Sequence, residues 1–542
     1  MSKTKLFYGV LFLQWCTLSI SQNILWENSY GGKHAEFLYD AISTPDYGFL
    51  LAGSSISNVN GNKTDSNKGN LDYWIWKMDE NGKPEWQKSY GGNGVDLLQS
   101  VKLTNDGGYI LGGSSNSNSG NDKKEDSKGF DDLWIVKLDA KGNEIWQRTI
   151  GGSGQEKLAS IAQTKDGGYI IGASSSSFRT EMDTDKFGKS EDSRGSMDYW
   201  VIKLDDKGNI KWQKTFGGQY VDELKSIEQT SDKGYILGGY SNSPVSGNKT
   251  QDNFGFNDYW IIKLDEEGNE LWQRTLGGDK DDTLFALTQT NDGGFIAGGN
   301  SSSGATNSKS KSNQNGTDFW ILKFDKTGTI EWQETYNYGK NDVLTSIVEN
   351  KDGTFLIGGY AQSEVGSEKL GTKSKTPLKK GSDKEGINDY IALKIKSTGE
   401  EIWTQTVGSK GDEILKKLFE TRDGGYILAG TSIGNASKDK NTAIGGSDFW
   451  VVKLRDNEKK IEEKEKIEAI PNPAISFTNV IVTYDYQKGT ATLFDLSGRS
   501  MQTIKLTGEK TIPVDLSNLP QGIYLIEIKT NVSTDGVKVI KK

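Results

Sequence analysis

The sequence predicts an all-β protein: a seven-bladed β-propeller over residues 22–456, followed by a small C-terminal β-sandwich. The main observation is an internal repeat, in which a tryptophan opens a polar segment that usually ends in Thr/Ser-x-Gly-Gly. This tryptophan recurs at Trp26, Trp86, Trp146, Trp212, Trp272, Trp332 and Trp403. Successive tryptophans of this set are 60 to 71 residues apart, and a period of this length indicates a repeat architecture. The low hydrophobic share (33%) and the 66 glycines favour short strands and turns over helices.

Each unit divides into four short strands. In the second copy we expect strands at 97–104, 109–115, 132–139 and 144–150, with tight turns at 105–108 and 140–143. Gly and Asn supply the positive φ that such turns require, and aromatic and β-branched residues fill the strands. Four antiparallel strands make one propeller blade. The repeat therefore predicts seven blades.

The chain begins out of phase with this unit. Residues 24–30 form a fourth strand with no third strand before it, and the last unit ends after its third strand at 448–454. We therefore expect the N-terminal strand to complete the seventh blade, which leaves no free sheet edge. The two tryptophans of each blade are expected in the core, with Ile391 replacing one of them in the sixth unit.

Length varies in only one part of the unit, the loop between the second and third strands. Examples are residues 115–130, 174–196 and 361–388, which are rich in Ser, Asn, Gly, Lys and Asp. We interpret this loop as free of structural constraint. Polar composition and variable length make it the natural place for binding.

Residues 1–21 are predicted to be a secretory signal peptide, with Gln22 as the first mature residue. Lys3 and Lys5 precede a short apolar run at 6–13. A lipoprotein signal at Cys16 is the weaker alternative, because Gln14 and Trp15 precede it instead of small residues. No segment reaches the roughly 20 apolar residues of a membrane span. We expect export to the periplasm and then to the cell exterior.

Composition excludes several kinds of site. Cys16 is the only cysteine and His34 the only histidine, so the mature chain lacks disulfides, thiol nucleophiles and His-based catalytic pairs. Net charge is −9 and no strongly basic stripe is present. Nucleic acid is therefore not expected as a partner.

The repeat pattern resembles that of a known group of secreted proteins. Residues 258–278 (Asp-Tyr-Trp-Ile-Ile-Lys-Leu-Asp-Glu-Glu-Gly-Asn-Glu-Leu-Trp-Gln-Arg-Thr-Leu-Gly-Gly) and 291–299 (Asn-Asp-Gly-Gly-Phe-Ile-Ala-Gly-Gly) resemble secreted propeller-type repeat proteins of Bacteroidota. The resemblance covers about residues 24–456. It implies an architecture and not a ligand, because those proteins mostly lack an assigned activity.

The C-terminal residues 468–542 resemble a type A sorting domain of the type IX secretion system. The resemblance rests on four motifs in order: Pro471-Asn-Pro473, Ala491-Thr-Leu-Phe-Asp-Leu-Ser-Gly-Arg499, Asp515-Leu-Ser-Asn-Leu-Pro-Gln-Gly-Ile-Tyr-Leu-Ile-Glu-Ile528 and Lys538-Val-Ile-Lys-Lys542. It implies the secretion machinery as a partner, and cargo that is released or attached to surface lipopolysaccharide. Alternating apolar strands independently predict a β-sandwich over 469–542, after an exposed charged linker at 457–468.

Two acidic positions recur in all seven units and are the candidate site residues. The set between blades is Glu36, Asp96, Glu156, Asp222, Asp282, Asp342 and Glu413. The set at the start of the third strand is Asp72, Asp132, Asp198, Asp258, Asp318, Asp389 and Asp448. The first interpretation is structural, with carboxylates accepting backbone N–H groups. The second is that the set between blades binds Ca²⁺, and the loops offer further candidates in Asp183-Thr-Asp185 and Glu191-Asp192, although no ordered Asp-x-Asp-x-Asp-Gly run is present.

Two enzyme hypotheses come from local resemblance. The run Lys-Leu-Asp-x-x-Gly-Asn-x-x-Trp resembles blades of pyrroloquinoline-quinone dehydrogenases, but near-identical blades are expected to leave no unique residue on the axis. Asp-rich turns resemble those of sialidases, which need an arginine cluster, whereas Arg148, Arg274 and Arg422 occupy different positions. We therefore expect no catalytic residues and no cofactor other than Ca²⁺.

The sequence as a whole predicts a secreted or surface-attached, non-catalytic binding protein that uses the long loops of one propeller face. A surface glycan or a protein fits this role, and seven similar loops allow multivalent contacts. A structural surface-layer component without a specific ligand is the main alternative. A propeller enzyme, quinoprotein- or glycosidase-like, is the third.

Overall fold

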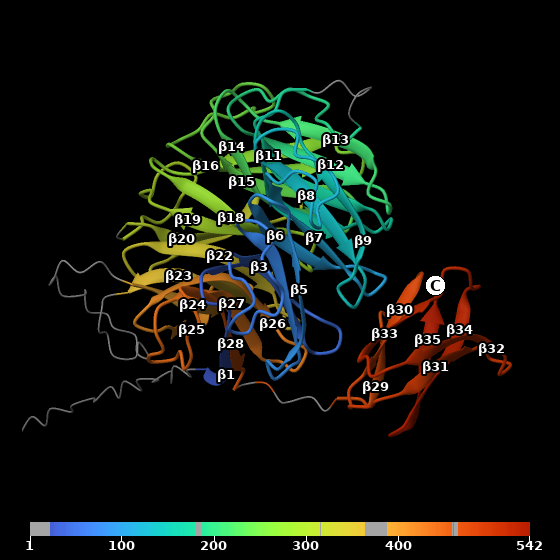
Figure 1. Ribbon diagram of the computed structural model, residues 1–542. Helices are drawn as coiled ribbons and strands as arrows, with labels where there is room; N and C mark the ends of the chain where they lie inside the picture. The colour runs from blue at the N-terminus through green and yellow to red at the C-terminus, as the bar shows by residue number, and fades with distance from the viewer. Residues whose placement is uncertain (1–21, 180–185, 315, 364–386, 458, 460–463) are drawn as a thin grey trace, which may run out of the picture.

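The computed structural model describes residues 22–179, 186–314, 316–363, 387–457, 459 and 464–542. All regular structure in these residues is β-strand, with no helix (Figure 1). The predicted signal peptide, residues 1–21, lies outside the described residues and stays a prediction. No helix in the described part of the chain is long and apolar enough to span a membrane.

The repeat region forms antiparallel four-stranded sheets, which we number in chain order. Sheet I is β2 (Glu36–Ser43), β3 (Phe49–Ser55), β4 (Asp72–Met78), β5 (Pro84–Tyr90); sheet II is β6 (Asp96–Leu103), β7 (Tyr109–Ser115), β8 (Asp132–Leu138), β9 (Glu144–Ile150); sheet III is β10 (Glu156–Gln163), β11 (Tyr169–Ser175), β12 (Asp198–Leu204), β13 (Ile210–Phe216). Sheet IV is β14 (Asp222–Gln229), β15 (Tyr235–Ser241), β16 (Asp258–Leu264), β17 (Glu270–Leu276); sheet V is β18 (Asp282–Gln289), β19 (Phe295–Ser301), β20 (Asp318–Phe324), β21 (Ile330–Tyr336). Sheet VI is β22 (Asp342–Glu349), β23 (Phe355–Ser363), β24 (Ile387–Ile395), β25 (Glu401–Val407); sheet VII is β26 (Asp412–Glu420), β27 (Tyr426–Ile433), β28 (Ser447–Arg455) and β1 (Asn23–Tyr30).

The turns between strands form where the sequence places Gly and Asp. After β6, Gly107 has φ of 78°, and the Thr104 amide donates to the Gly108 carbonyl at 2.9 Å. Asp106 accepts hydrogen bonds from the Gly108 amide and from Lys137 of β8. One carboxylate thus fixes the turn and ties it to the third strand.

The first and last strands of the repeat region lie side by side. β1 pairs antiparallel with β28, so that Tyr30 lies opposite Phe449. The first strand of each sheet packs against the first strand of the next, and β26 packs against β2. These seven first strands are therefore the innermost layer of the repeat region. The tight turns within each sheet lie at one end of the strands, which we call the turn side. The variable loops and the connections between sheets lie at the other end.

The core lies between neighbouring sheets. The third-strand tryptophans Trp74, Trp134, Trp200, Trp260, Trp320 and Trp450 are fully buried. Trp134 of sheet II lies 4.7 Å from the ring of Tyr73 in sheet I, and the Tyr73 hydroxyl donates to the Trp134 carbonyl at 2.9 Å. Fourth-strand tryptophans such as Trp86 are only half-buried and cover the next turn, at Gly142.

The C-terminal domain consists of two packed sheets. One has the order β29 (Ile467–Ile470), β30 (Phe477–Val482), β33 (Thr511–Asp515); the other has the order β32 (Ser500–Leu506), β31 (Gly489–Phe494), β34 (Gly522–Thr530), β35 (Thr534–Lys541). Their facing side chains form one hydrophobic core. β29 already includes Ile467 and Glu468, which the sequence had placed in the linker, because Ile467 packs into this core.

The C-terminal domain contacts the turn side of the repeat region, next to sheets I and II (Figure 1). Glu468 accepts from Arg422 at 2.6 Å and from Tyr47 at 2.6 Å, and Lys141 forms an ion pair with Glu509 at 2.9 Å. In the charged segment between the domains, Lys459 pairs with Glu420 at 2.5 Å. Part of the predicted exposed linker is therefore held against the repeat region.

Candidate functional site

Both predicted sets of acidic residues lie at one face of the sheets, where first and third strands begin. We call this the loop face. All seven carboxylates of the set between blades are fully buried: Glu36, Asp96, Glu156, Asp222, Asp282, Asp342 and Glu413. The third-strand set, Asp72, Asp132, Asp198, Asp258, Asp318, Asp389 and Asp448, is buried as well. Neither set is open to solvent.

The set between blades anchors the start of each first strand. Glu156 accepts from the Gly152 amide at 3.1 Å and from the hydroxyls of Ser175 and Ser177 at 2.7 and 2.6 Å. Asp282 likewise accepts from the Gly278 amide and the Ser303 hydroxyl, both at 2.7 Å. These bonds join one sheet to the connection that precedes it, as the structural interpretation expects.

The third-strand set closes the variable loop. Six of the seven accept a backbone N–H from the residue four positions earlier, such as Arg194 to Asp198 at 2.6 Å and Ile444 to Asp448 at 2.9 Å. For the seventh, Asp389, the residue at that position lies outside the described residues. The two sets then meet between sheets. Asp132 of sheet II and Glu156 of sheet III lie next to each other, and a Cβ at Gly151 would contact both carboxylates. We call each such place a junction.

Carboxylates at the junctions hold protons more tightly than usual. Burial, together with the neighbouring Asp96, raises the pKa of Asp72 to about 6. Burial and Asp318 raise the pKa of Asp342 to about 7. Burial also raises the pKa of Glu156 to about 7, with Asp132 adding to the shift. Two carboxylates in one dry site cannot both ionise cheaply.

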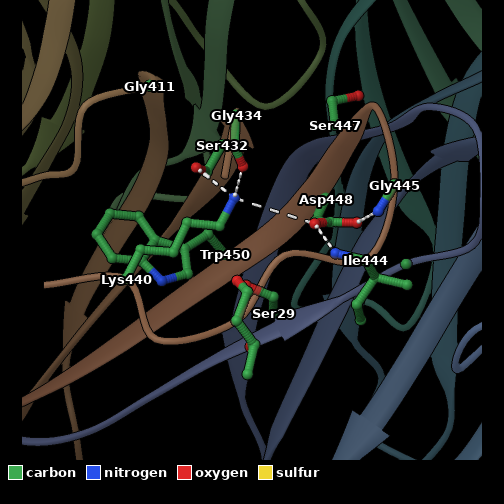
Figure 2. Close-up of polar contacts among 12 residues, drawn as sticks. Ser29, Gly411, Ser432, Gly434, Lys440, Ile444, Gly445, Ser447, Asp448 and Trp450 are labelled. Atoms are coloured by element: carbon green, nitrogen blue, oxygen red, sulfur yellow. Dashed lines mark hydrogen bonds and ion pairs between the residues drawn. The ribbon is translucent and has the colours of Figure 1, made fainter. Parts of the chain in front are cut away.

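A buried lysine lies beside the acids of each sheet for which its loop is described. These lysines are Lys63, Lys123, Lys189, Lys249, Lys309 and Lys440. Figure 2 shows the last of them: Lys440 donates to the Ser432 hydroxyl at 2.9 Å and to the Gly434 carbonyl at 3.1 Å, and lies 4.0 Å from Asp448. Burial lowers the pKa of Lys249 to about 8, although Asp222 and Asp258 oppose the shift.

Sequence reasoning missed these lysines and was wrong to interpret the loop as unconstrained. Within the loops, isolated antiparallel β-bridges pair Lys63 with Asn60, Lys123 with Gly120 and Lys249 with Ser246. A signal for them was present, because the lysine precedes the third-strand Asp by nine residues at Lys63 to Asp72 and again at Lys309 to Asp318. Lysine in a Ser- and Asn-rich loop is ordinarily solvated, and that hid the pattern.

One oxygen of many third-strand carboxylates has no hydrogen-bond partner. This holds for the Oδ1 atoms of Asp72, Asp132, Asp198 and Asp258. The junction between sheets V and VI differs, because Asn337 replaces the usual glycine and donates to Asp318 Oδ1 at 2.7 Å. A proton shared between the two paired carboxylates would satisfy such an atom in the other junctions.

The calcium prediction stays open but finds little support in the donor set. Among the described residues, no three or more His, Cys, Asp or Glu side chains gather in a way that could hold a metal ion. Each junction offers two carboxylates, and lysine supplies the neighbouring positive charge. Of the loop acids, Glu191 accepts from the Thr215 amide at 3.0 Å, and Asp183 and Asp185 lie outside the described residues.

One position on the innermost strands differs from sheet to sheet. At the position three residues after each first-strand acid, the seven sheets carry Tyr39, Gln99, Ala159, Lys225, Phe285, Thr345 and Lys416, all half-buried. The outer strands repeat almost unchanged, but this position differs in nearly every sheet. Packing between sheets constrains the outer strands and leaves the innermost positions free to vary.

The loop face also carries every exposed aromatic side chain of the described residues. They are Phe130, Phe178, Tyr220, Phe254 and Phe256, which we call the aromatic arc. Their exposed fractions range from 45% at Phe254 to 74% at Phe130. All five come from the loops of sheets II to IV or from the connection between sheets III and IV.

The chain is similar over much of its length to one curated protein and to several solved structures. The chain is 23% identical over 346 residues to regulatory protein FlaEY of Caulobacter vibrioides, a match that covers 60% of this chain and 35% of the relative. The chain thus spans about a third of that relative's length. Sqt1 from Chaetomium thermophilum matches 81% of this chain and 98% of its own, at 10% identity and a TM-score of 0.40. A duf4221 family member from Bacteroides vulgatus has the same coverage and identity and a TM-score of 0.35.

The family comparison concerns the C-terminal domain. Residues 468–542 match the model of the secretion system C-terminal sorting domain. The match begins at Glu468 inside β29 and ends at the last residue of the chain, so it covers the two-sheet domain. It implies export to the cell surface or secretion, with the secretion machinery as partner. Residues 468–542 are a type IX secretion system C-terminal sorting domain.

Proposed function

We propose that this chain is a secreted, non-catalytic binding protein, a closed seven-bladed propeller whose loop face binds a surface glycan. The observation that carries the proposal is the aromatic arc. Burying a large aromatic side chain stabilises a fold, so five such side chains left in water on one face favour a role in contact with a ligand.

The contacts between sheets support the closed ring. β1 completes sheet VII by pairing with β28, and β2 packs against β26, β27 and β28. The Ser447 hydroxyl donates to the Glu36 carbonyl at 3.1 Å, which joins sheet VII to sheet I. In such a ring every sheet has all four strands, and the edges that remain are those of short outer strands.

A glycan fits the arc better than other ligands. Flat, partly exposed rings offer stacking surfaces to sugars, and the loops around them are rich in Ser and Asn, which supply hydrogen bonds. Several rings on neighbouring sheets provide repeated weak contacts, and a polymer can use them together. The buried junction carboxylates do not reach such a ligand, which supports a non-catalytic role.

A structural surface component is the second candidate. The acids that sequence reasoning offered as ligands, and the lysines beside them, are engaged with each other and with the backbone, as in a rigid scaffold. The sorting domain serves either role equally well. The two candidates differ in what removal of the aromatic arc does.

The test is a glycan-array and polysaccharide-retention measurement on residues 22–542. The variant Phe130→Ala/Phe178→Ala/Phe256→Ala is compared with the wild type and with Leu271→Ala, an exposed apolar residue on an outer strand. We expect the triple variant to lose about tenfold or more in apparent affinity, at unchanged stability, and Leu271→Ala to bind normally. Equal retention by all three proteins, or no retention by a folded wild type, overturns the proposal.

A calcium arm belongs to the same experiment. We expect a chelator to change neither retention nor melting temperature, because lysine lies beside the carboxylates at the junctions. Loss of retention on chelation, restored by added Ca²⁺, would instead promote Glu36, Asp96, Glu156, Asp222, Asp282, Asp342 and Glu413 to ligands.

A further inference from the structure

The innermost strands carry two layers of charged side chains that differ in balance. We call the layer nearer the sorting domain the turn-side layer: Asp40, Lys102, Glu228 and Lys417. We call the other the loop-side layer: Lys157, Glu223, Lys225 and Lys416. The first has two lysines and two acids, whereas the second has three lysines and one acid.

The turn-side layer is neutralised from within. Lys102 forms an ion pair with Asp40 at 2.8 Å, although the two residues come from neighbouring sheets. Burial lowers the pKa of Lys417, and the nearby carboxylates of Asp40 and Glu228 oppose this shift. Glu228 belongs to sheet IV and Lys417 to sheet VII, so these charges interact across the axis. Every lysine of this layer therefore has a carboxylate nearby.

The loop-side layer is not neutralised in this way. Lys225 pairs with Glu223 of its own strand, and its ammonium lies 5.5 Å from the ring of Phe285. Lys416 lies 5.6 Å from the ring of Tyr39. Among the described residues, its ammonium has no ion pair and no hydrogen bond. A half-buried ammonium without an anion is unusual, because burial penalises an unpaired charge.

The two ammonium groups also oppose each other. They occupy the same register position on β14 and β26, three residues after Asp222 and Glu413. The pKa of Lys416 is lowered by burial and by the charge of Lys225, so the two side chains interact although their sheets are not neighbours. An anion between them would convert this repulsion into two charge-assisted hydrogen bonds.

We propose that Lys225 and Lys416 form an anion-binding site on the propeller axis, for a small organic acid or acidic sugar. The oxyanion, a carboxylate, sulfate or phosphate, lies between the two ammonium groups. Its carbon frame lies against Tyr39 and Phe285, whose rings flank the lysines. The inference depends on the closed ring proposed above, but not on a ligand at the aromatic arc.

The test titrates residues 22–542 with inorganic phosphate, sulfate, glucuronate and, as the neutral control, glucose. Calorimetry at low ionic strength compares the wild type with Lys416→Met, Lys225→Met and Lys326→Met, the last a control in an exposed outer turn. We expect the anions to bind and glucose not to bind. Each axial substitution should weaken anion binding about tenfold or more, and Lys326→Met should not.

Stronger binding of glucuronate than of the inorganic ions assigns the carbon frame to Tyr39 and Phe285. Failure of all three anions to bind at about ten millimolar, or equal binding by Lys416→Met and wild type, overturns the site. A glycan that binds the array but is unaffected by Lys416→Met separates this inference from the loop-face proposal.

A second readout distinguishes a binding role from a structural one. After reductive ¹³C-methylation, the NMR signal that disappears in Lys416→Met reports this ammonium. We expect phosphate to raise its pKa, because the anion stabilises the charged form. We also expect Lys416→Met to melt at a higher temperature than wild type, since repulsion is removed. A lower melting temperature together with an unchanged NMR signal on adding phosphate contradicts the inference.

Discussion

The junctions at the loop face and the innermost strands lie within the same repeat unit but differ in what varies. At the junctions, the same carboxylates and the same lysine return from sheet to sheet and are buried among backbone amides. On the innermost strands, Tyr39, Lys225 and Lys416 occupy one register position in three different sheets. Repetition here indicates what holds neighbouring sheets together, and variation indicates where a ligand could be recognised.

The largest expected effect comes from removing a junction lysine. In Lys249→Met, the carboxylates of Asp222 and Asp258 lose their buried positive partner, and we expect a loss of about 3–5 kcal/mol in the free energy of unfolding. Chemical denaturation measures it, with Lys326→Met as the exposed control. A loss below about 1 kcal/mol would mean that the junction lysine contributes little to the free energy of unfolding.

A rise in pH is expected to have a smaller effect on stability, and this effect is a loss. The folded pKa values of Asp72 (about 6) and Asp342 (about 7) lie above the usual value of 3.8. The stability that these carboxyls contribute is fully present below about pH 4 and is lost as pH rises through 6 to 7. Melting temperature should therefore fall from about pH 5 to about pH 8.

The variant Asp342→Asn sharpens this prediction, because an amide does not ionise. It should melt above wild type near pH 8, and the difference should close near pH 5. Asp206→Asn, an exposed position in a turn, is the control and should follow the wild-type profile. Parallel profiles for wild type and Asp342→Asn would assign the pH dependence to other groups.

The smallest effect concerns the one junction that differs. Asn337→Gly restores the glycine found elsewhere and removes the hydrogen bond to Asp318 Oδ1. We expect a loss of about 1–3 kcal/mol, because a buried carboxylate oxygen becomes unpartnered. Asn341→Gly, at an exposed position nearby, measures the backbone cost of glycine together with the loss of one exposed hydrogen bond to Gln362. Equal losses in both would show that the other junctions need no such donor.

Much of the fold could be read from residue patterns, and the reason is local. Strands β7 and β9 begin and end at the predicted residues, because alternating apolar residues and Gly-containing turns act over a few positions. The acidic positions were also found, since they begin strands. Lys440 and Asn337 were missed, because what defines them is burial against another segment, and this depends on the assembled sheets.

The variable position on the innermost strands was overlooked for a related reason. A repeat detected through its tryptophans gives weight to the positions that recur, and Lys416 stands at a position that does not. Sequence reasoning considered variation between units only in loop length. Charges that influence each other between distant sheets, such as Glu228 of sheet IV and Lys417 of sheet VII, become related only in the folded protein.

The pairing of β1 with β28 has a consequence for the order of events during synthesis. Trp450 donates to Glu27 at 2.7 Å, and the two residues lie 423 positions apart in the chain. Sheet VII therefore stays incomplete until nearly the whole repeat region has left the ribosome, and until then β1 exposes an open edge. A chain that stops before Arg455 keeps this edge, and β1 of one molecule can then accept the last strand of another. Pairing of β1 with β28 therefore removes the open edge only in molecules whose repeat region is fully synthesised.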